Sequence, residues 1–102
     1  MKLFLLSQDL VSGYDTYDSC VVVAENEEDA RKIHPSKFVT HITADKWMGN
    51  YSVGDKGEYE TENDSYSTWV HFDDIDKINV QFLGEAELEL KKGMVCASFN
   101  AG

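Results

Sequence analysis

The stretch INVQFLGEAELELKKGMVCASFN, residues 78–100, carries the clearest structural signal in the chain. From residue 78 to residue 90 every even position is apolar or glycine, and the odd positions are polar except Leu83. This period of two is typical of a strand with one buried face and one solvated face. A two-residue turn at Lys92 and Gly93 would pair this strand with residues 94–99 and place the apolar residues of both on one face. A helix over residues 85–92 is the alternative, because EAELELKK contains good helix formers.

Two further strands are expected near the N-terminus. Residues 2–8 form a short apolar run without helical spacing, and residues 20–24, CVVVA, are rich in β-branched side chains and apolar on both faces. The second run therefore predicts a central strand. Between them lies YDTYDSC, residues 14–20, whose Asp, Thr and Ser are residues that satisfy turn backbone groups. We expect the mouth of a β-hairpin there, and we expect Cys20 and Cys96 to be buried reduced thiols.

A short helix is predicted over residues 27–34 from the segment ENEEDARKIHP. Asn26 is a suitable N-cap, acids occupy the first turn, and His34 lies near the end, where a base interacts favourably with the helix dipole. Residues 37–42 suggest another strand, residues 43–49 one helical turn, and residues 50–67 a long acidic loop or ragged hairpin. The expected fold is an α+β single domain of residues 1–102, with a mainly antiparallel sheet of four or five strands and the helix packed on one face.

The charge distribution excludes some classes of partner. The chain has 19 acids against nine bases, a net charge of −10, and residues 55–76 contain eight acids and one lysine. Such a field repels nucleic-acid phosphates and anionic membranes and attracts basic protein surfaces. We therefore expect no direct nucleic-acid partner and no membrane partner.

No catalytic or cofactor motif is present. The chain contains no Walker loop, dinucleotide-binding glycine pattern, nucleophile elbow or C-x-x-C pair, and its three histidines lack zinc-site spacing. The acidic run Asp73, Asp74 and Asp76 does not fit an EF-hand, because Ile78 and Asn79 stand where an oxygen ligand and a glycine are needed. A helix start or turn before residue 78 is the simpler interpretation. The expectation is a protein that is not an enzyme, without catalytic residues, metal ligands or cofactor.

Aromatic residues accompany the acids, and this combination is typical of a protein interface. Trp69 is expected in the core, whereas Trp47 suits the core and the interface equally. The predicted partner-binding residues are Trp47, Asp55, Glu58, Tyr59, Glu60, Glu62, Asp64, Tyr66, Asp73, Asp74 and Asp76.

The segments YDTYDSCVVVAENEEDARKIHP, residues 14–35, and ASFNAG, residues 97–102, resemble a family of small acidic proteins encoded by bacteriophages and prophages. The resemblance implies a protein of the host bacterial cytoplasm that binds and disables a host component, such as restriction or CRISPR machinery. It implies no catalytic residues. The start MKLFLL agrees with a cytoplasmic location, because its apolar run is much shorter than that of a signal peptide.

The leading hypothesis is a non-catalytic inhibitor whose acidic side chains occupy a basic, nucleic-acid-binding groove of a host protein. Such a protein acts as a nucleic-acid mimic. Two alternatives stay open. The domain could be a structural or assembly protein that forms a homodimer through an exposed strand edge, or it could bind a divalent cation through Asp73, Asp74 and Asp76.

Overall fold

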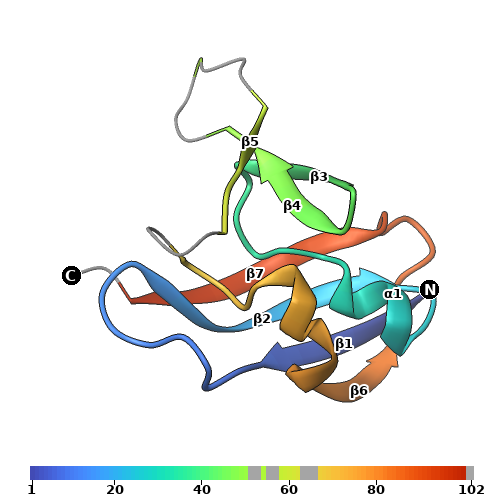
Figure 1. Cartoon of the computed structure of the whole chain (residues 1–102). Helices are drawn as coiled ribbons and strands as arrows, with labels where there is room; N and C mark the ends of the chain where they lie inside the picture. The colour runs from blue at the N-terminus through green and yellow to red at the C-terminus, as the bar shows by residue number, and fades with distance from the viewer. Residues whose placement is uncertain (51–53, 55–57, 63–66, 101–102) are drawn as a thin grey trace.

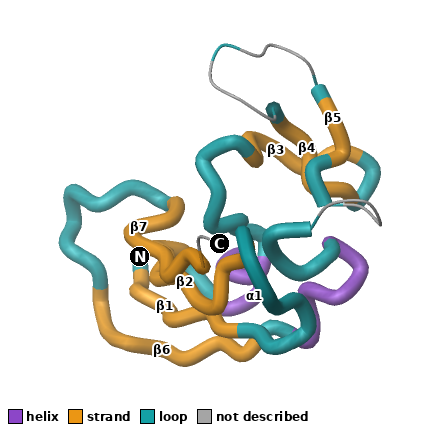
Figure 2. The backbone as a smooth tube through the Cα atoms, turned by 90° about the vertical axis from the view of Figure 1, so that its left-hand side faces the viewer, coloured by secondary structure: helices purple, strands orange, loops and turns teal. Residues whose placement is uncertain are grey.

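Two antiparallel sheets form the framework of the protein. The computed structural model describes residues 1–50, 54, 58–62 and 67–100. The larger sheet has the strand order β6-β1-β2-β7, with β1 (Lys2–Ser7), β2 (Thr16–Ala24), β6 (Asn79–Glu85) and β7 (Gly93–Asn100). The smaller sheet has the order β3-β4-β5, with β3 (Val39–Thr43), β4 (Lys46–Gly49) and β5 (Tyr59–Glu60). The short helices α1 (Glu27–Arg31) and η1 (Phe72–Lys77) lie on one side of the larger sheet (Figures 1 and 2). The α+β prediction is confirmed, with two sheets in place of one.

The N-terminal hairpin forms as predicted. β1 and β2 pair in antiparallel register from Lys2 opposite Ala24 to Ser7 opposite Ser19. β2 starts at Thr16, earlier than expected, so most of the YDTYDSC segment belongs to the strand. Gln8 stabilises the start of the loop between β1 and β2, because its side-chain oxygen accepts hydrogen bonds from the amides of Leu10 and Val11 at 2.8 Å.

The predicted pairing of the two C-terminal strands is wrong. β6 pairs with β1 and β7 pairs with β2, so the two strands occupy opposite edges of the larger sheet. β6 ends at Glu85, and the next amide, that of Ala86, donates to the carbonyl of Met1. The apolar side chains that follow, in the connection of residues 86–92, are not buried. Leu88 is fully exposed and Leu90 is 38% exposed. A free edge on each side of the β1–β2 hairpin offers each strand a partner, and nothing in the alternation specifies which edge is used.

Helix α1 begins as predicted and ends early. The side chain of Asn26 accepts from the amide of Asp29 at 2.8 Å, which confirms the N-cap. The helix packs on the larger sheet through buried Ala30 and stops at Arg31. His34 is therefore outside the helix, so its predicted role as a partner of the helix dipole is wrong.

The segment predicted as a helical turn is part of a hairpin. The strand expected over residues 37–42 is present as β3, and β4 follows after a tight turn at Ala44 and Asp45. Both turn residues have positive φ, 52° and 57°, as two-residue hairpin turns require. Gly49 ends β4 beside the backbone of Phe38, where a Cβ atom would collide with the Phe38 carbonyl oxygen. This glycine serves close strand packing and does not cap a helix.

The core lies between the helices and the larger sheet. Trp69 is fully buried there with Val70 and Ile78, as predicted for Trp69. Cys20 is buried, and burial raises the pKa of its thiol to about 12. Cys96 is exposed on edge strand β7, which corrects the expectation that both thiols are buried.

Membrane insertion through a helix is not a feature of the described residues. α1 has five residues and η1 has six, and neither is long and apolar enough to cross a bilayer.

Candidate functional site

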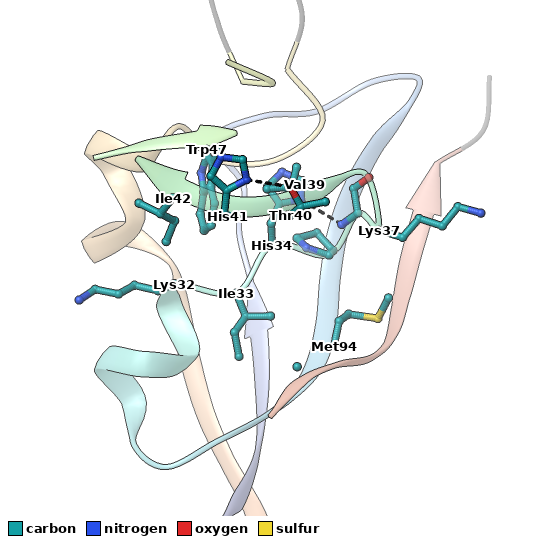
Figure 3. Close-up of a pocket in the computed structure, with 13 residues that line it drawn as sticks. Lys32, Ile33, His34, Lys37, Val39, Thr40, His41, Ile42, Trp47 and Met94 are labelled. Atoms are coloured by element: carbon teal, nitrogen blue, oxygen red, sulfur yellow. Dashed lines mark hydrogen bonds between the residues drawn. The ribbon is translucent and has the colours of Figure 1, made fainter. Parts of the chain in front are cut away.

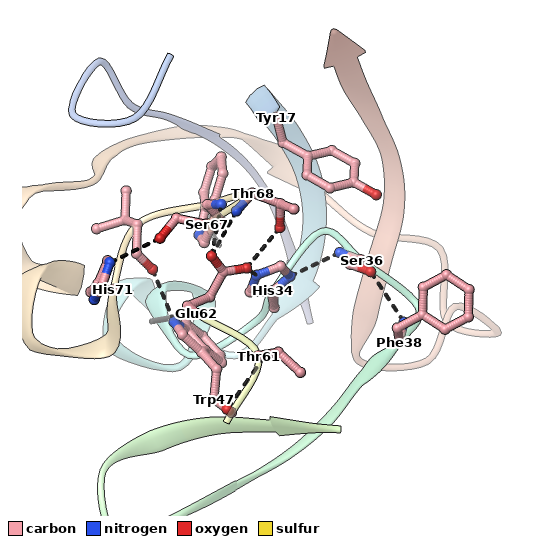
Figure 4. Close-up of polar contacts among 12 residues, drawn as sticks. Tyr17, His34, Ser36, Phe38, Trp47, Thr61, Glu62, Ser67, Thr68 and His71 are labelled. Carbon is pink, nitrogen blue, oxygen red and sulfur yellow. Dashed lines mark hydrogen bonds and ion pairs between the residues drawn. The ribbon is translucent and has the colours of Figure 1, made fainter. Parts of the chain in front are cut away.

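A buried carboxylate joins three segments of the chain beneath the smaller sheet. Glu62 Oε1 accepts from Thr68 Oγ1 and lies 2.7 Å from His34 Nε2, and Glu62 Oε2 accepts from the amides of Thr68 and Trp69 at 2.7 and 3.3 Å (Figure 4). The side chains of His34 and Glu62 are each 1% exposed. Buried polar groups are stable when their hydrogen bonds are satisfied. Here the carboxylate has four partners.

The hydrogen bonds also define the state of His34. The amide of Ser36 donates to His34 Nδ1 at 2.9 Å, so this nitrogen has no proton and Nε2–H donates to Glu62. Burial lowers the pKa of His34, and the neighbouring Glu62 opposes this effect only in part. The contact is therefore a hydrogen bond from a neutral imidazole to a carboxylate, although its geometry also meets the distance criterion of an ion pair.

This arrangement predicts that acid destabilises the protein. The pKa of His34 lies below its ordinary value of 6.5 in the folded chain, so below pH 6.5 the unfolded chain binds more protons. The free energy of unfolding should fall as the pH decreases from 7.5 to 5.5, by at most about 1.4 kcal/mol per pH unit for one site. Urea unfolding at several pH values measures it. A His34→Gln variant keeps a donor towards Glu62 and should show a weaker pH dependence, and an unchanged slope would contradict the assignment.

Trp47 connects the smaller sheet to the segment before η1 through a hydrogen bond and ring contacts. Its Nε1–H donates to the carbonyl oxygen of Val70 at 3.0 Å, and its ring meets the rings of His34 and Phe72 edge to face, with centroids 5.1 and 5.3 Å away. Trp47 is 2% exposed and Glu62 is 3% exposed. Both side chains are therefore nearly buried and hydrogen-bonded within the protein, and both also line the hollow described next.

Above this frame, acids from separate segments surround one hollow of about 310 Å³. We call it the acidic recess. Asp45 comes from the β3–β4 turn, Glu60 from β5 and Asp73 from η1, and the lining also includes Lys46 and His71. Lys46 Nζ lies 3.6 Å from a carboxylate oxygen of Glu60. Among the described residues, four carboxylates, including that of the buried Glu62, line the recess with one lysine, so the lining is negative. Glu60, Glu62 and Asp73 were predicted, whereas Asp45 was missed because only its place in the hairpin turn brings it there.

The other predicted partner-binding residues lie elsewhere. Glu58 is exposed, with a carboxylate oxygen 3.9 Å from His41, and Tyr59 is 41% exposed. Asp74 pairs with Lys77 at 3.1 Å and raises the pKa of that lysine, mainly through their hydrogen bond. Asp76 lines a different hollow, between η1 and α1. Three predicted residues lie outside the described residues: Asp55, Asp64 and Tyr66.

The described residues form no metal-binding cluster and only part of a catalytic arrangement. They contain no group of three or more His, Cys, Asp and Glu residues that could hold a metal ion. η1 directs Asp73 and Asp76 to different hollows, so the predicted cation cluster is not assembled. Ser67 Oγ lies 3.0 Å from His71 Nε2, but within the described chain no carboxylate is hydrogen-bonded to His71. A nucleophile and base without a group that orients the base is a weak basis for catalysis.

No protein-family model matches the chain, and neither a curated protein nor a solved structure is significantly similar to it.

Proposed function

We propose that this protein is a non-catalytic binding protein whose acidic recess holds a lysine or arginine side chain of a host protein. The supporting observation is that Asp45, Glu60 and Asp73, from three separate segments, line one hollow in which Lys46 is the only lysine among the residues that the structure describes. The basic side chain belongs to a surface that normally binds nucleic acid. The resemblance to phage-encoded acidic proteins supports a host component, such as restriction or CRISPR machinery, in the bacterial cytoplasm.

The physical basis is electrostatic attraction followed by local fit. A net charge of −10 accelerates encounter with a basic surface, and salt screens this attraction over about 10 Å at moderate ionic strength. Carboxylates around a hollow offer a guanidinium the charge-assisted hydrogen bonds that it forms best. The buried Glu62 and Trp47 contacts hold the walls of the recess, so little ordering is needed on binding.

The experiment compares two triple variants with the same change in charge. The immobilised wild-type protein is used to capture proteins from a bacterial lysate, and the dissociation constant of each captured protein is then measured at low and high salt. The recess variant Asp45→Asn/Glu60→Gln/Asp73→Asn should weaken that binding by at least about 100-fold, because hydrogen bonds to charged groups contribute about 1.5–3 kcal/mol each and the loss of only one or two of them already corresponds to that factor.

The control variant carries Glu85→Gln, Glu87→Gln and Glu89→Gln, at exposed positions in and after β6. It should retain the captured proteins with at most a few-fold loss. Equal loss in both variants would reduce the effect to net charge and contradict a specific recess. Unchanged capture by the recess variant would place the binding surface elsewhere.

A further inference from the structure

Strand β7 presents an open sheet edge without charged residues. It is the last strand in the order β6-β1-β2-β7, and among the described residues only β2 pairs with it. Residues 94–100 are all exposed. Natural proteins usually protect edge strands with charged residues or proline, but GMVCASFN contains neither. Such an edge is a template for pairing with another strand.

The register with β2 defines which side chains of β7 share a face. Met94 lies opposite Val22, Ala97 opposite Cys20 and Phe99 opposite Tyr17. Their β2 partners are core residues or pack against the core, so these three β7 residues face the helix side of the sheet. Cys96 and Ser98 lie opposite Val21 and Ser19, on the other face. A bulge at Val95 keeps Met94 and Ala97 on the same side.

A groove of about 400 Å³ runs between the start of β7 and the smaller sheet (Figure 3). Met94 and Ile33 line it on one side, and Val39 and Ile42 of β3 line it on the other. Lysines 32 and 37 are the charged residues of its lining, besides two histidines, and no described acid lines it. This β7 groove is therefore apolar and weakly basic in a chain that is strongly acidic elsewhere.

We propose that β7 pairs in antiparallel orientation with β7 of a second copy of this chain, with the two-fold axis at Ala97. Ala97 then lies opposite Ala97, and Cys96 lies opposite Ser98 of the second copy. Because Val95 is in the bulge, Met94 is the residue that lies opposite Phe99 of the second copy and on the same face. Phe99 is 45% exposed at one end of β7, and the groove opens at the other end. Antiparallel pairing brings each exposed ring to the partner's groove, so the edge is complementary to itself, as a two-fold interface requires.

The charges agree with this arrangement. Two copies that each carry −10 repel one another, but β7 is uncharged and Lys32 lies at the groove end. At the opposite end, the Asp18 carboxylate accepts from Asn100 Nδ2 at 3.0 Å. Antiparallel pairing directs Asp18 of each copy towards the lysine end of the other. The two chains therefore meet along strands that carry no charged side chain.

The first test is the mass in solution, measured by light scattering. The wild-type chain of 11.5 kDa should have twice its mass. Ala97→Lys places two like charges at the two-fold axis and should raise the dissociation constant about 100-fold, because close like charges cost several kcal/mol across an interface. Gln81→Lys, on the opposite edge strand β6, is the matched control and should remain dimeric. Circular dichroism and thermal melting verify that each variant is folded.

The second test measures the register of the two β7 strands by cross-linking, and it stays valid if Ala97→Lys does not fold. In a Ser98→Cys variant the introduced thiol faces Cys96 of the second copy, so mild oxidation should give a covalent dimer on non-reducing gels. Gln81→Cys, with its thiol on the other edge, should remain uncross-linked.

The inference is overturned by a wild-type chain that is monomeric at its highest soluble concentration, or by a dimer that Gln81→Lys disrupts and Ala97→Lys does not. Equal cross-linking of the two cysteine variants would also overturn it. The acidic recess contains no residue of β7. A negative capture experiment would therefore contradict the proposed binding function and leave the dimer unaffected, and a monomeric chain would do the reverse.

Discussion

Replacing Glu62 with glutamine is expected to lower the free energy of unfolding by about 3 kcal/mol, because the carboxylate accepts four hydrogen bonds in a site with 1% exposure. The amide has nearly the same shape, so the change tests hydrogen bonding and charge with little change in packing. One end of the amide can only donate. Whichever way it is turned, an N–H group then faces a donor from His34, Thr68 or Trp69.

Urea unfolding of the wild-type and variant proteins measures this loss. Glu58→Gln is the matched control, because Glu58 lies four residues earlier and is exposed, and surface substitutions usually change stability by at most about 0.5 kcal/mol. A loss below about 1 kcal/mol for Glu62→Gln would show that the network tolerates an amide. The buried carboxylate would then not be the group that joins the three segments.

Local signals in the sequence predicted the elements that depend on neighbouring residues. Asn26 caps α1 through a contact three residues away, and the β1–β2 hairpin follows from two apolar runs around a polar turn. β6 was also predicted as a strand from its alternation. Its partner was not predicted correctly, because the choice between a neighbouring strand and a free sheet edge depends on packing far along the chain.

The same distinction explains the errors within the candidate site. His34 has the position of a helix-end base in the sequence, but its actual partner, Glu62, is 28 residues away. Glu62 is one acid among 19, and no local feature separates it from the exposed ones. Burial of a carboxylate requires donors from several segments, and the sequence alone does not show that Thr68, Trp69 and His34 converge. The acidic recess combines one predicted region with Asp45, which only the β3–β4 turn brings near.

Trp47→Ala is expected to lower the free energy of unfolding by about 4 kcal/mol, a large part of the 5–15 kcal/mol typical of a small domain. The side chain is 2% exposed and contacts the rings of His34 and Phe72. Its removal leaves a cavity and deprives the Val70 carbonyl of its donor. Urea unfolding measures the loss. Ile42→Ala on neighbouring β3, where the side chain is 36% exposed, is the control and should cost about 1 kcal/mol or less.

A milder change separates the structural role of Trp47 from the partner contact suggested by the sequence. Trp47→Phe keeps an aromatic ring between His34 and Phe72 and removes the hydrogen bond to Val70, so it should cost about 1–2 kcal/mol and leave a folded protein. Trp47 lines both the acidic recess and the β7 groove. If it is only a wall between them, Trp47→Phe should retain the captured proteins and the dimer with less than a few-fold change. A tenfold loss of the captured proteins in this folded variant would mean that the indole itself contacts the partner, and the assignment of Trp47 to the core alone would be wrong.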